Sequence, residues 1–420
     1  MVRVTRCANG LTVVSESVPD ARSATVGFYF EVGSRDEPAG QAGIAHFLEH
    51  LVFKGTYKRS AREIVEAFES RGGDVNGETD RELTAYFGRV LADDLPLAVE
   101  VLGDMLCHPR LDPRDISLEL GVVAEEIKRY EDSPHEQVHD YIARALWPSS
   151  ALGRPVLGEL DALRALSRDD LLEFVNSRYI PQRLIVSAAG RISHDELVRL
   201  AEEHFTREPP DSPASPERRA ELAPGNVLCC EKDLEQVHLC LGCPGYPMGD
   251  ERRFALALVN SALGGTASSR LFQEVREKRG LVYSIWSYIV RLTDTGALII
   301  AMGTSAENVP RVLEVVRREA ADIAQRGLKP EELERARRHA QGSLVLAHEN
   351  IAARPGWNVQ SLRATGRVMS IDEIVARIGA VTREDTARVA AETLGAGPLC
   401  AAAVGPVTEE ELKPLVAPVC

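Results

Sequence analysis

Two similar segments, placed 215 residues apart, constrain the fold of this chain more than any other feature of its sequence. Residues 185–197 read IVSAAGRISHDEL, and residues 400–412 read CAAAVGPVTEEEL. In both segments an apolar run ends at a glycine and is followed by Ser193 or Thr408, residue types that cap helix N-termini. A strand, a turn and a capped helix are therefore predicted twice, which indicates two copies of one αβ unit.

A proline-rich stretch separates the two copies. Residues 206–225 contain five prolines among charged residues and show almost no apolar periodicity. Such a composition is typical of a linker between domains. We therefore predict a first half over residues 1–206, a linker over residues 207–225 and a second half over residues 226–420.

The apolar pattern predicts the main elements of the first half. Strands are expected at residues 11–17, 24–32, 74–79, 83–90 and 184–190, and the first two of these are expected to pair. Helices are expected through His46, from the capping box at Ser60 to Ser70, in three segments between residues 93 and 146, and over residues 193–205.

Composition excludes several classes of protein. Hydrophobic residues make up 44% of the chain, but no run of about 18 apolar residues is present to span a membrane. A net charge of −14 argues against nucleic acid and anionic membranes as partners and is compatible with cationic peptides. Residues 1–20 lack a secretory or mitochondrial targeting pattern, so we expect a cytoplasmic protein. Its eight cysteines, including Cys240 and Cys243, are then expected to be reduced core residues.

The segment His46–Thr56 carries the clearest chemical signal. In a helix, His46 and His50 lie one turn apart on the same face, where two imidazoles can bind one metal ion. Glu49 lies beside that face, close enough to take a proton from a metal-activated water. This arrangement is typical of a hydrolytic zinc site, with the order of the commoner His-Glu-x-x-His motif inverted.

A catalytic zinc ion usually has three protein ligands, so one more is needed. A helical pattern further along the chain contains Glu119, Glu125 and Glu126. Glu119 and Glu126 are two turns apart and share a face, whereas Glu125 is turned away by about 100°. Spacing alone does not choose among these acids.

A second motif competes with the first. His135-Glu136-Gln137-Val138-His139 is a literal His-Glu-x-x-His, and Glu159 lies at a suitable distance along the chain for a third ligand. However, Pro134 places this motif in the exposed first turn of a helix, and a charged Asp140 follows it directly. We therefore regard a zinc site at His135 and His139 as the less favoured alternative.

The segments His46–Thr56 and Val122–Pro134 resemble the inverted-zincin peptidases, the family of pitrilysin, insulin-degrading enzyme and the mitochondrial processing peptidase β subunit. The resemblance is strongest to the processing-peptidase branch and its bacterial relatives, and it extends over essentially the whole chain. It implies an α+β fold of two homologous αβ-roll halves, each a mixed or antiparallel sheet covered by helices, which form a clamshell.

The resemblance also implies the roles of individual residues. One Zn²⁺ per chain is expected to be held by His46, His50 and Glu126, with Glu49 as the catalytic base. Glu119 corresponds to a further acid of the family site and is expected to support its catalysis.

Substrate contacts are implied in the same way. The segment Ser268–Tyr283 resembles the part of the family that supplies an arginine and a tyrosine for substrate and oxyanion binding, here Arg276 and Tyr283. The strand containing Asn76 and Gly77 resembles the family strand whose edge pairs with an extended substrate, although Gly77 replaces the usual alanine.

The implied function is a zinc metalloendopeptidase that cleaves unfolded peptides or presequence-like segments. We expect a homodimer, or a heterodimer with a related subunit. The alternative is a noncatalytic, peptide-binding subunit of the same family. Such subunits typically lack part of the ligand set, whereas this chain retains all of it.

Overall fold

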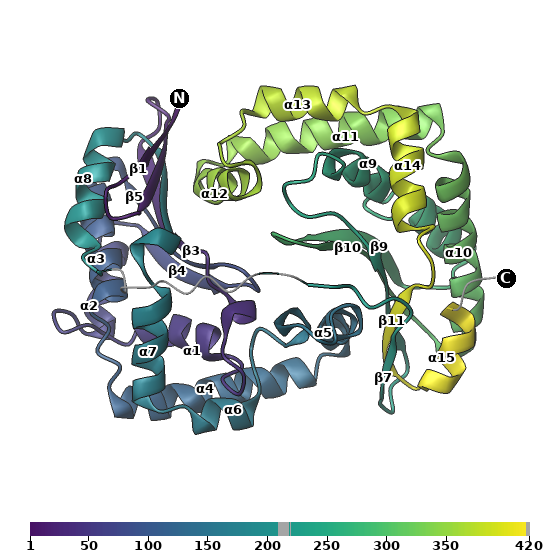
Figure 1. Ribbon diagram of the computed structural model, residues 1–420, viewed down its shortest axis with the longest axis horizontal. Helices are drawn as coiled ribbons and strands as arrows, with labels where there is room; N and C mark the ends of the chain where they lie inside the picture. The colour runs from purple at the N-terminus through teal and green to yellow at the C-terminus, as the bar shows by residue number, and fades with distance from the viewer. Residues whose placement is uncertain (209–217, 219, 417–420) are drawn as a thin grey trace. The chain divides into compact units, whose positions relative to one another are not determined.

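The computed structural model describes residues 1–208, 218 and 220–416 (Figure 1). The predicted linker, residues 207–225, therefore lies largely outside the described residues. The chain divides into two compact units. The first unit contains Met1–Lys128, Arg154–Glu217 and Ala347–Met369, and the second contains Arg129–Gly153, Arg218–Leu346 and Ser370–Cys420.

The first unit is built on a six-stranded sheet with the order β1-β2-β6-β3-β5-β4. Strands β2 and β6 are parallel, and all other neighbours are antiparallel. The strands are β1 (Val2–Arg6), β2 (Thr12–Ser17), β3 (Ser23–Phe30), β4 (Asp74–Thr79), β5 (Thr84–Leu91) and β6 (Leu184–Gly190).

The predicted pairing of the strands at residues 11–17 and 24–32 is wrong, because β6 lies between β2 and β3. Every residue of β6 is buried. A strand of small and apolar residues that is buried on both faces belongs in the interior of a sheet. The two strands that are adjacent in sequence therefore each pair with β6.

The second unit repeats this arrangement with the order β7-β11-β8-β10-β9. Its strands are β7 (Val227–Glu231), β8 (Val237–Pro244), β9 (Ser284–Arg291), β10 (Gly296–Thr304) and β11 (Cys400–Gly405). Strands β7 and β11 are parallel, as β2 and β6 are in the first sheet, and the other neighbouring strands are antiparallel. The first sheet has β1 as an additional edge strand. Strand β9 thus corresponds to β4 as an edge strand.

Two glycines mark the duplication. Gly190 ends β6 with a φ of 135°, and Gly405 ends β11 with a φ of 143°. A Cβ atom on Gly190 would lie 2.3 Å from the Ser23 carbonyl oxygen, and one on Gly405 would lie 2.6 Å from the Gln236 carbonyl oxygen. Both positions exclude a side chain because the backbone at the start of the neighbouring strand in the sheet, β3 or β8, is in direct contact with the glycine.

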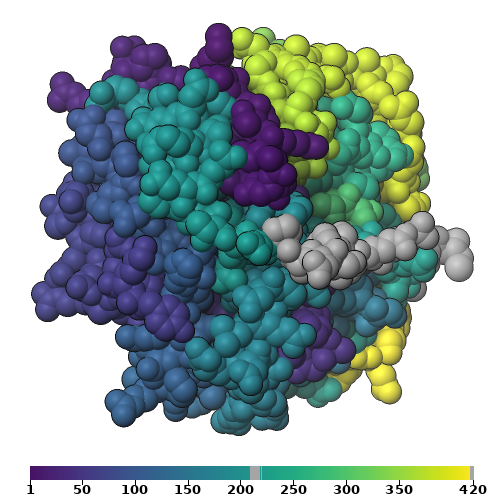
Figure 2. Space-filling model, turned by 60° about the vertical axis from the view of Figure 1, so that its left-hand side comes forward, coloured from purple at the N-terminus to yellow at the C-terminus, as the bar shows by residue number. Residues whose placement is uncertain are grey.

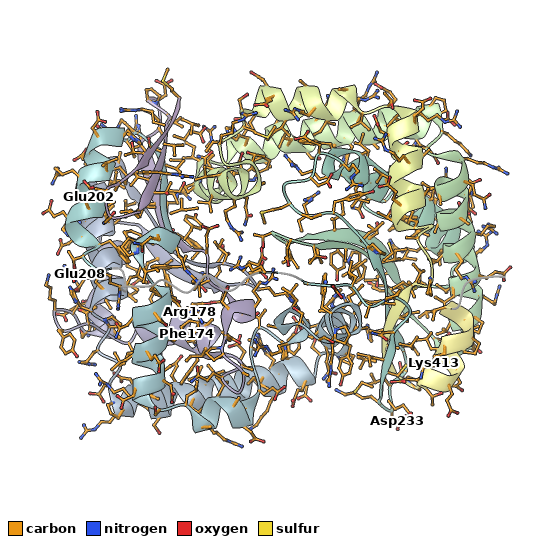
Figure 3. The ribbon with its side chains drawn as sticks, viewed as in Figure 1. Phe174, Arg178, Glu202, Glu208, Asp233 and Lys413 are labelled. Carbon is orange, nitrogen blue, oxygen red and sulfur yellow. The ribbon has the colours of Figure 1, made fainter. Side chains whose placement is uncertain are left out.

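Helices cover one face of the first sheet and enclose its main apolar core. Their bounds are α1 (Ile44–Val52), α2 (Ala61–Glu69), α3 (Leu95–Cys107), α4 (Pro113–Glu131), α6 (Leu160–Ala165), α7 (Arg168–Arg178) and α8 (His194–His204). Helix α8 packs on β2, and Figure 2 shows purple N-terminal atoms bordering teal atoms of later residues on this surface. Figure 3 labels Phe174 of α7, which is buried in this core, and Glu202 on the exposed side of α8.

The opposite face of the first sheet is covered by α12 (Arg354–Thr365). Arg363 of this helix forms a buried ion pair with Glu82 at 3.2 Å and a partly exposed one with Glu31 at 3.3 Å. Arg354 binds Glu16 at 2.9 Å. Helix α12 thus contributes an element from late in the sequence to the first unit.

The second unit contains a corresponding exchange. Helix α5 (Pro134–Leu146) comes from early in the sequence and packs on β8 and β11. The unit also contains α9 (Arg253–Leu263), α10 (Val309–Arg326), α11 (Pro330–Glu349), α13 (Ile371–Ala380), α14 (Arg383–Thr393) and α15 (Glu409–Val416). Two of the boundaries between the units fall within helices, one in α4 and one in α11. The compact units therefore differ from the predicted sequence halves by residues 129–153 and 347–369.

Cys240 and Cys243 of β8 are buried and free, as expected for core residues. Among the described residues, none of the helices combines the length and the apolar character needed to cross a membrane.

Candidate metal centre

Helix α1 is held firmly at its N-terminus. The carboxylate of Glu37 accepts hydrogen bonds from the backbone N–H groups of Gly43 at 2.9 Å and Ala45 at 3.1 Å. Gly43 has a φ of 96°, and a Cβ atom there would lie 2.8 Å from the Cα atom of Gly158. The apolar face of the helix is buried in the core, which directs the histidine face toward α4.

His46 and His50 lie on this face as predicted, with their ring centroids 4.7 Å apart. Glu126 of α4 places Oε2 3.8 Å from Nε2 of His46 and 3.6 Å from Nε2 of His50. One ligand atom from each of the three residues lies within 4.8 Å of the others, and no other such group occurs among the described residues. Burial, together with the charge of His50, lowers the pKa of His46 to about 4. Its imidazole is therefore neutral near pH 7, the form that binds a metal ion.

Glu119 lies behind the histidine pair. Its Oε1 is 2.8 Å from Nδ1 of His50, and its Oε2 is 2.6 Å from Nζ of Lys54. A carboxylate at this position keeps the hydrogen of His50 on Nδ1, so that the Nε2 lone pair faces Glu126. The structure thus brings the predicted Glu119 next to the predicted ligands, in contact with one of them.

Glu49 follows on the same helix and is largely buried beside β4. Thr79 Oγ1 donates a hydrogen bond of 2.6 Å to Glu49 Oε2. Burial raises the pKa of Glu49, and this effect outweighs the Thr79 hydrogen bond and the charge of His50, which lower it. A carboxylate with a raised pKa is a stronger base, which suits proton transfer near neutral pH.

Asn76 and Gly77 lie on β4, which pairs with β5 alone among the described strands. Asn76 is exposed, and its Oδ1 accepts a hydrogen bond from the backbone N–H of Gly77 at 2.9 Å. Gly77 faces Glu49, because a Cβ atom added to it would lie 2.9 Å from Glu49 Cγ. The edge strand and the candidate base are therefore in direct contact.

Arg276 and Tyr283 belong to the second unit. Arg276 lies in a π-helical turn, Phe272–Glu277, with its guanidinium carbon 4.6 Å from the ring centroid of Phe272. Tyr283 is 79% exposed and directly precedes β9. The role of both residues in substrate binding stays a prediction.

The competing motif in α5 has other neighbours. The ring of His135 packs against Trp286, with centroids 5.3 Å apart, and Nδ1 of His139 lies 2.6 Å from the hydroxyl of Tyr288. Neither histidine belongs to a group of three ligand atoms within the described part of the chain. Glu159, the proposed third ligand of this motif, belongs to the first unit.

Three residues that contact the site were not identified from the sequence. Thr79 could have been found from its position two residues after Gly77 on the same strand face. Lys54 could have been found from its position one turn after His50. No local signal identifies Glu37, which reaches α1 through the loop before it.

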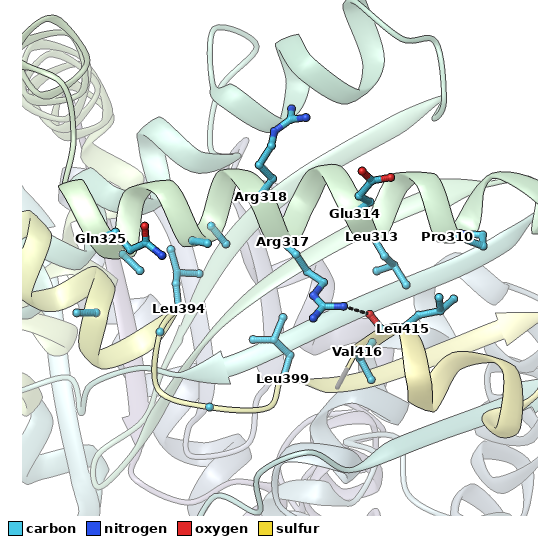
Figure 4. A pocket seen from close by; sticks show the side chains of 16 residues that line it. Pro310, Leu313, Glu314, Arg317, Arg318, Gln325, Leu394, Leu399, Leu415 and Val416 are labelled. Atoms are coloured by element: carbon cyan, nitrogen blue, oxygen red, sulfur yellow. Dashed lines mark hydrogen bonds between the residues drawn. The ribbon is translucent and has the colours of Figure 1, made fainter. Parts of the chain in front are cut away.

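A separate hollow of about 790 Å³ lies in the second unit (Figure 4). It is lined by α10, α14, α15 and the segment between α14 and β11. Arg317 Nη1 donates a hydrogen bond to the Leu415 carbonyl oxygen at its wall. The described lining is mostly alkyl and includes a single acid, Glu314. This composition does not suit a metal ion.

Comparison with known proteins identifies the family. Residues 12–160 match the model of the insulinase family (peptidase family M16), and residues 165–339 match the model of the peptidase M16 inactive domain. The chain is 41% identical to an uncharacterized zinc protease of Streptomyces coelicolor, with 99% of this chain and 92% of the relative covered. It is 38% identical to the uncharacterized zinc protease YmxG of Bacillus subtilis, with 91% and 93% covered.

Solved structures show the same fold. A protease from Helicobacter pylori matches with a TM-score of 0.89 at 22% identity, over 97% of this chain and 99% of that chain. A peptidase M16 inactive domain from Pseudomonas fluorescens matches with a TM-score of 0.89 at 19% identity, over 97% and 98%. The two family models cover more than half of the sequence, and the two relatives match over nearly its whole length. The chain therefore belongs to peptidase family M16, the insulinase family, as the sequence predicted.

Proposed function

We propose that this protein is a zinc metalloendopeptidase that cleaves unfolded peptides. The observation that carries the proposal is the convergence of His46, His50 and Glu126 beside the half-buried carboxylate of Glu49. Two imidazoles and one carboxylate form the donor set of many catalytic zinc sites. The zinc protease names of the relatives support the same metal.

The residues fit a zinc ion in a further respect. Glu119 contacts His50, and Lys54 forms an ion pair with Glu119. His50 therefore has the carboxylate partner that typically orients a zinc-binding histidine. Zinc bound here would supply a Lewis acid and make water a better nucleophile near neutral pH. The chain itself must supply the base, the proton carrier and the substrate site.

Glu49 is proposed as that base. Its carboxylate takes a proton from the attacking water and then delivers it to the nitrogen of the leaving amine. The Thr79 hydroxyl occupies one of its two oxygens. The other oxygen is left to exchange the proton.

The edge of β4 is proposed as the peptide site. An extended peptide can add to an exposed sheet edge through backbone hydrogen bonds, with little demand on its sequence. The proposed contacts are the backbone of Asn76 and Gly77, supplemented by Arg276 and Tyr283. Because a peptide must be extended to pair in this way, we expect the protein to cleave unfolded or presequence-like peptides and not folded proteins. The net charge of −14 favours peptides that carry basic residues.

The test compares two matched substitutions. Glu49→Gln should retain one zinc ion per chain and lose cleavage of an unstructured peptide, because an amide cannot accept the proton. Glu136→Gln changes the equivalent acid of the competing motif and should leave both zinc content and cleavage unchanged. Zinc is measured by elemental analysis, and cleavage by fluorescence of a quenched peptide with and without chelator.

Two other results would redirect the assignment. Substantial turnover by Glu49→Gln would refute its role as base. Wild-type protein that binds the peptide with no chelator-sensitive cleavage would support the noncatalytic alternative.

We also propose that the chain acts as a homodimer, because it carries both the ligand set and the Arg276/Tyr283 pair. Light scattering on the active protein tests this state, and activity that requires a second, related subunit would refute it.

A further inference from the structure

One face of strand β4 lies against the carboxylate of Glu49. Its residues alternate between exposed and half-buried positions, and Gly77 and Thr79 share the half-buried face. Thr79 Oγ1 bonds to Oε2 of Glu49 at 2.6 Å, whereas a Cβ atom on Gly77 would lie 3.2 Å from Oε1. Both carboxylate oxygens of Glu49 are therefore adjacent to this one face of the strand.

We propose that Thr79 is the positioning residue for Glu49, and that Gly77 provides the space in which Thr79 can hold it. This inference rests on the proposed function, since it assigns the orientation of the base in that reaction. The strand whose edge would bind the peptide would then also set the position of the base. Substrate backbone and proton acceptor would be aligned by the same element.

The geometry of Thr79 supports an orienting role. It is the last residue of β4, and the turn that follows is anchored by backbone hydrogen bonds from Ser34 to the Asp80 carbonyl at 3.1 Å and from Arg35 to the Arg81 carbonyl at 3.0 Å. Threonine is also restricted in χ1 by its branched Cβ atom. The hydroxyl therefore reaches Glu49 from a rigid support, and its bond to a carboxylate belongs to the stronger class of hydrogen bonds.

The absence of a side chain at Gly77 leaves space beside Glu49. Its φ angle is not positive, so alanine would fit the backbone without strain. The added methyl group would nevertheless lie 2.9 Å from Cγ of Glu49 and 3.2 Å from Cε2 of Phe53. A contact below 3.0 Å requires a shift, so the methyl group would displace Glu49, and Phe53 leaves it little alternative space. A displaced Glu49 would weaken its hydrogen bond with Thr79.

The test uses the full chain with zinc. Thr79→Val keeps the size and branching of the side chain but removes the hydroxyl, and Thr79→Ser keeps the hydroxyl. We expect Thr79→Val to lower kcat about 10- to 100-fold with KM and zinc content unchanged, as for other residues that orient an active group. Thr79→Ser should recover most of this loss. Gly77→Ala should lower kcat through displacement of Glu49, and a wild-type kcat in this variant would show that alanine, the usual family residue here, leaves Glu49 in place.

Thr365→Val is the matched control. Its hydroxyl bonds to the Ser361 and Arg367 carbonyl oxygens in and after α12, away from α1 and β4. This variant should keep the wild-type kcat. Equal losses in Thr79→Val and Thr79→Ser would instead show a packing role, and wild-type kcat in Thr79→Val would overturn the inference.

A second measurement separates this inference from the proposed function. Crystal structures of the wild type and Thr79→Val report the position of the Glu49 carboxylate whether or not the protein cleaves peptides. A displaced or disordered carboxylate supports the positioning role, and an unchanged one refutes it. Absence of cleavage by the wild-type protein would refute the peptidase proposal alone.

Discussion

Glu37 allows a quantitative test of how α1 is anchored. Its carboxylate is buried against the backbone N–H groups of Gly43 and Ala45, and Arg154 donates a hydrogen bond to its backbone carbonyl at 3.0 Å. Burial raises the pKa of Glu37 from its ordinary value of 4.5 to about 7, although the two N–H groups and Arg154 act in the opposite direction. The folded protein therefore binds this proton more tightly than the unfolded chain does.

The sign of the effect follows from linkage. A carboxyl group with a raised pKa contributes stability below pH 4.5, and this contribution is lost as the pH rises through about 7. A tenfold difference in proton affinity is worth about 1.4 kcal/mol, so the total is about 3 kcal/mol. Glu37→Gln is neutral at every pH. Its free energy of unfolding, relative to wild type, should therefore increase by about 3 kcal/mol between pH 4 and pH 8.

The assay is urea unfolding followed by circular dichroism at several pH values, with chelator present so that metal binding does not contribute. Glu63→Gln is the matched control. Glu63 is exposed, and the backbone N–H of Ser60 lowers its pKa, so the stability it contributes is lost as the pH falls. Its substitution should change stability with the opposite pH dependence. Parallel pH profiles for Glu37→Gln and wild type would refute the assignment of a raised pKa to Glu37.

Three further outcomes are expected. His46→Ala should lose both zinc and peptide cleavage, whereas His139→Ala should keep both, as measured by elemental analysis and peptide hydrolysis. Arg363→Met should lower the free energy of unfolding by about 3 kcal/mol in urea, because it leaves Glu82 buried with one partner fewer; a loss within error would show that α12 does not depend on this ion pair. Gly190→Ala should cost about 2 kcal/mol or more, because its φ of 135° disfavours a side chain and the Ser23 carbonyl occupies the space; a melting temperature equal to wild type would contradict this.

Local elements were predicted well where the sequence carries its own signal. The predicted strands at residues 74–79 and 184–190 coincide with β4 and β6, and the capping box at Ser60 begins α2. These signals depend on residues close together in the chain, such as a hydroxyl that bonds to a backbone N–H three residues later. The spacing of His46 and His50 on α1 has the same local origin.

Neighbours in space were predicted less well. The expected pairing of β2 with β3 fails because β6, more than 150 residues later, inserts between them. The transfer of α5 and α12 to the unit of the other half was also not foreseen. Amphipathic helices show that one face is to be buried but do not show which sheet will bury it.

The candidate site shows the same division. The sequence by itself determined the helix with His46, Glu49 and His50, because helical periodicity places these side chains on adjoining positions. Only the tertiary structure decided that Glu126 approaches the histidines, and that Glu119 lies behind them and Thr79 beside Glu49. Those contacts depend on how α4 and β4 pack on α1. Packing of this kind is set by the shape and burial of the whole core, which no short stretch of sequence contains.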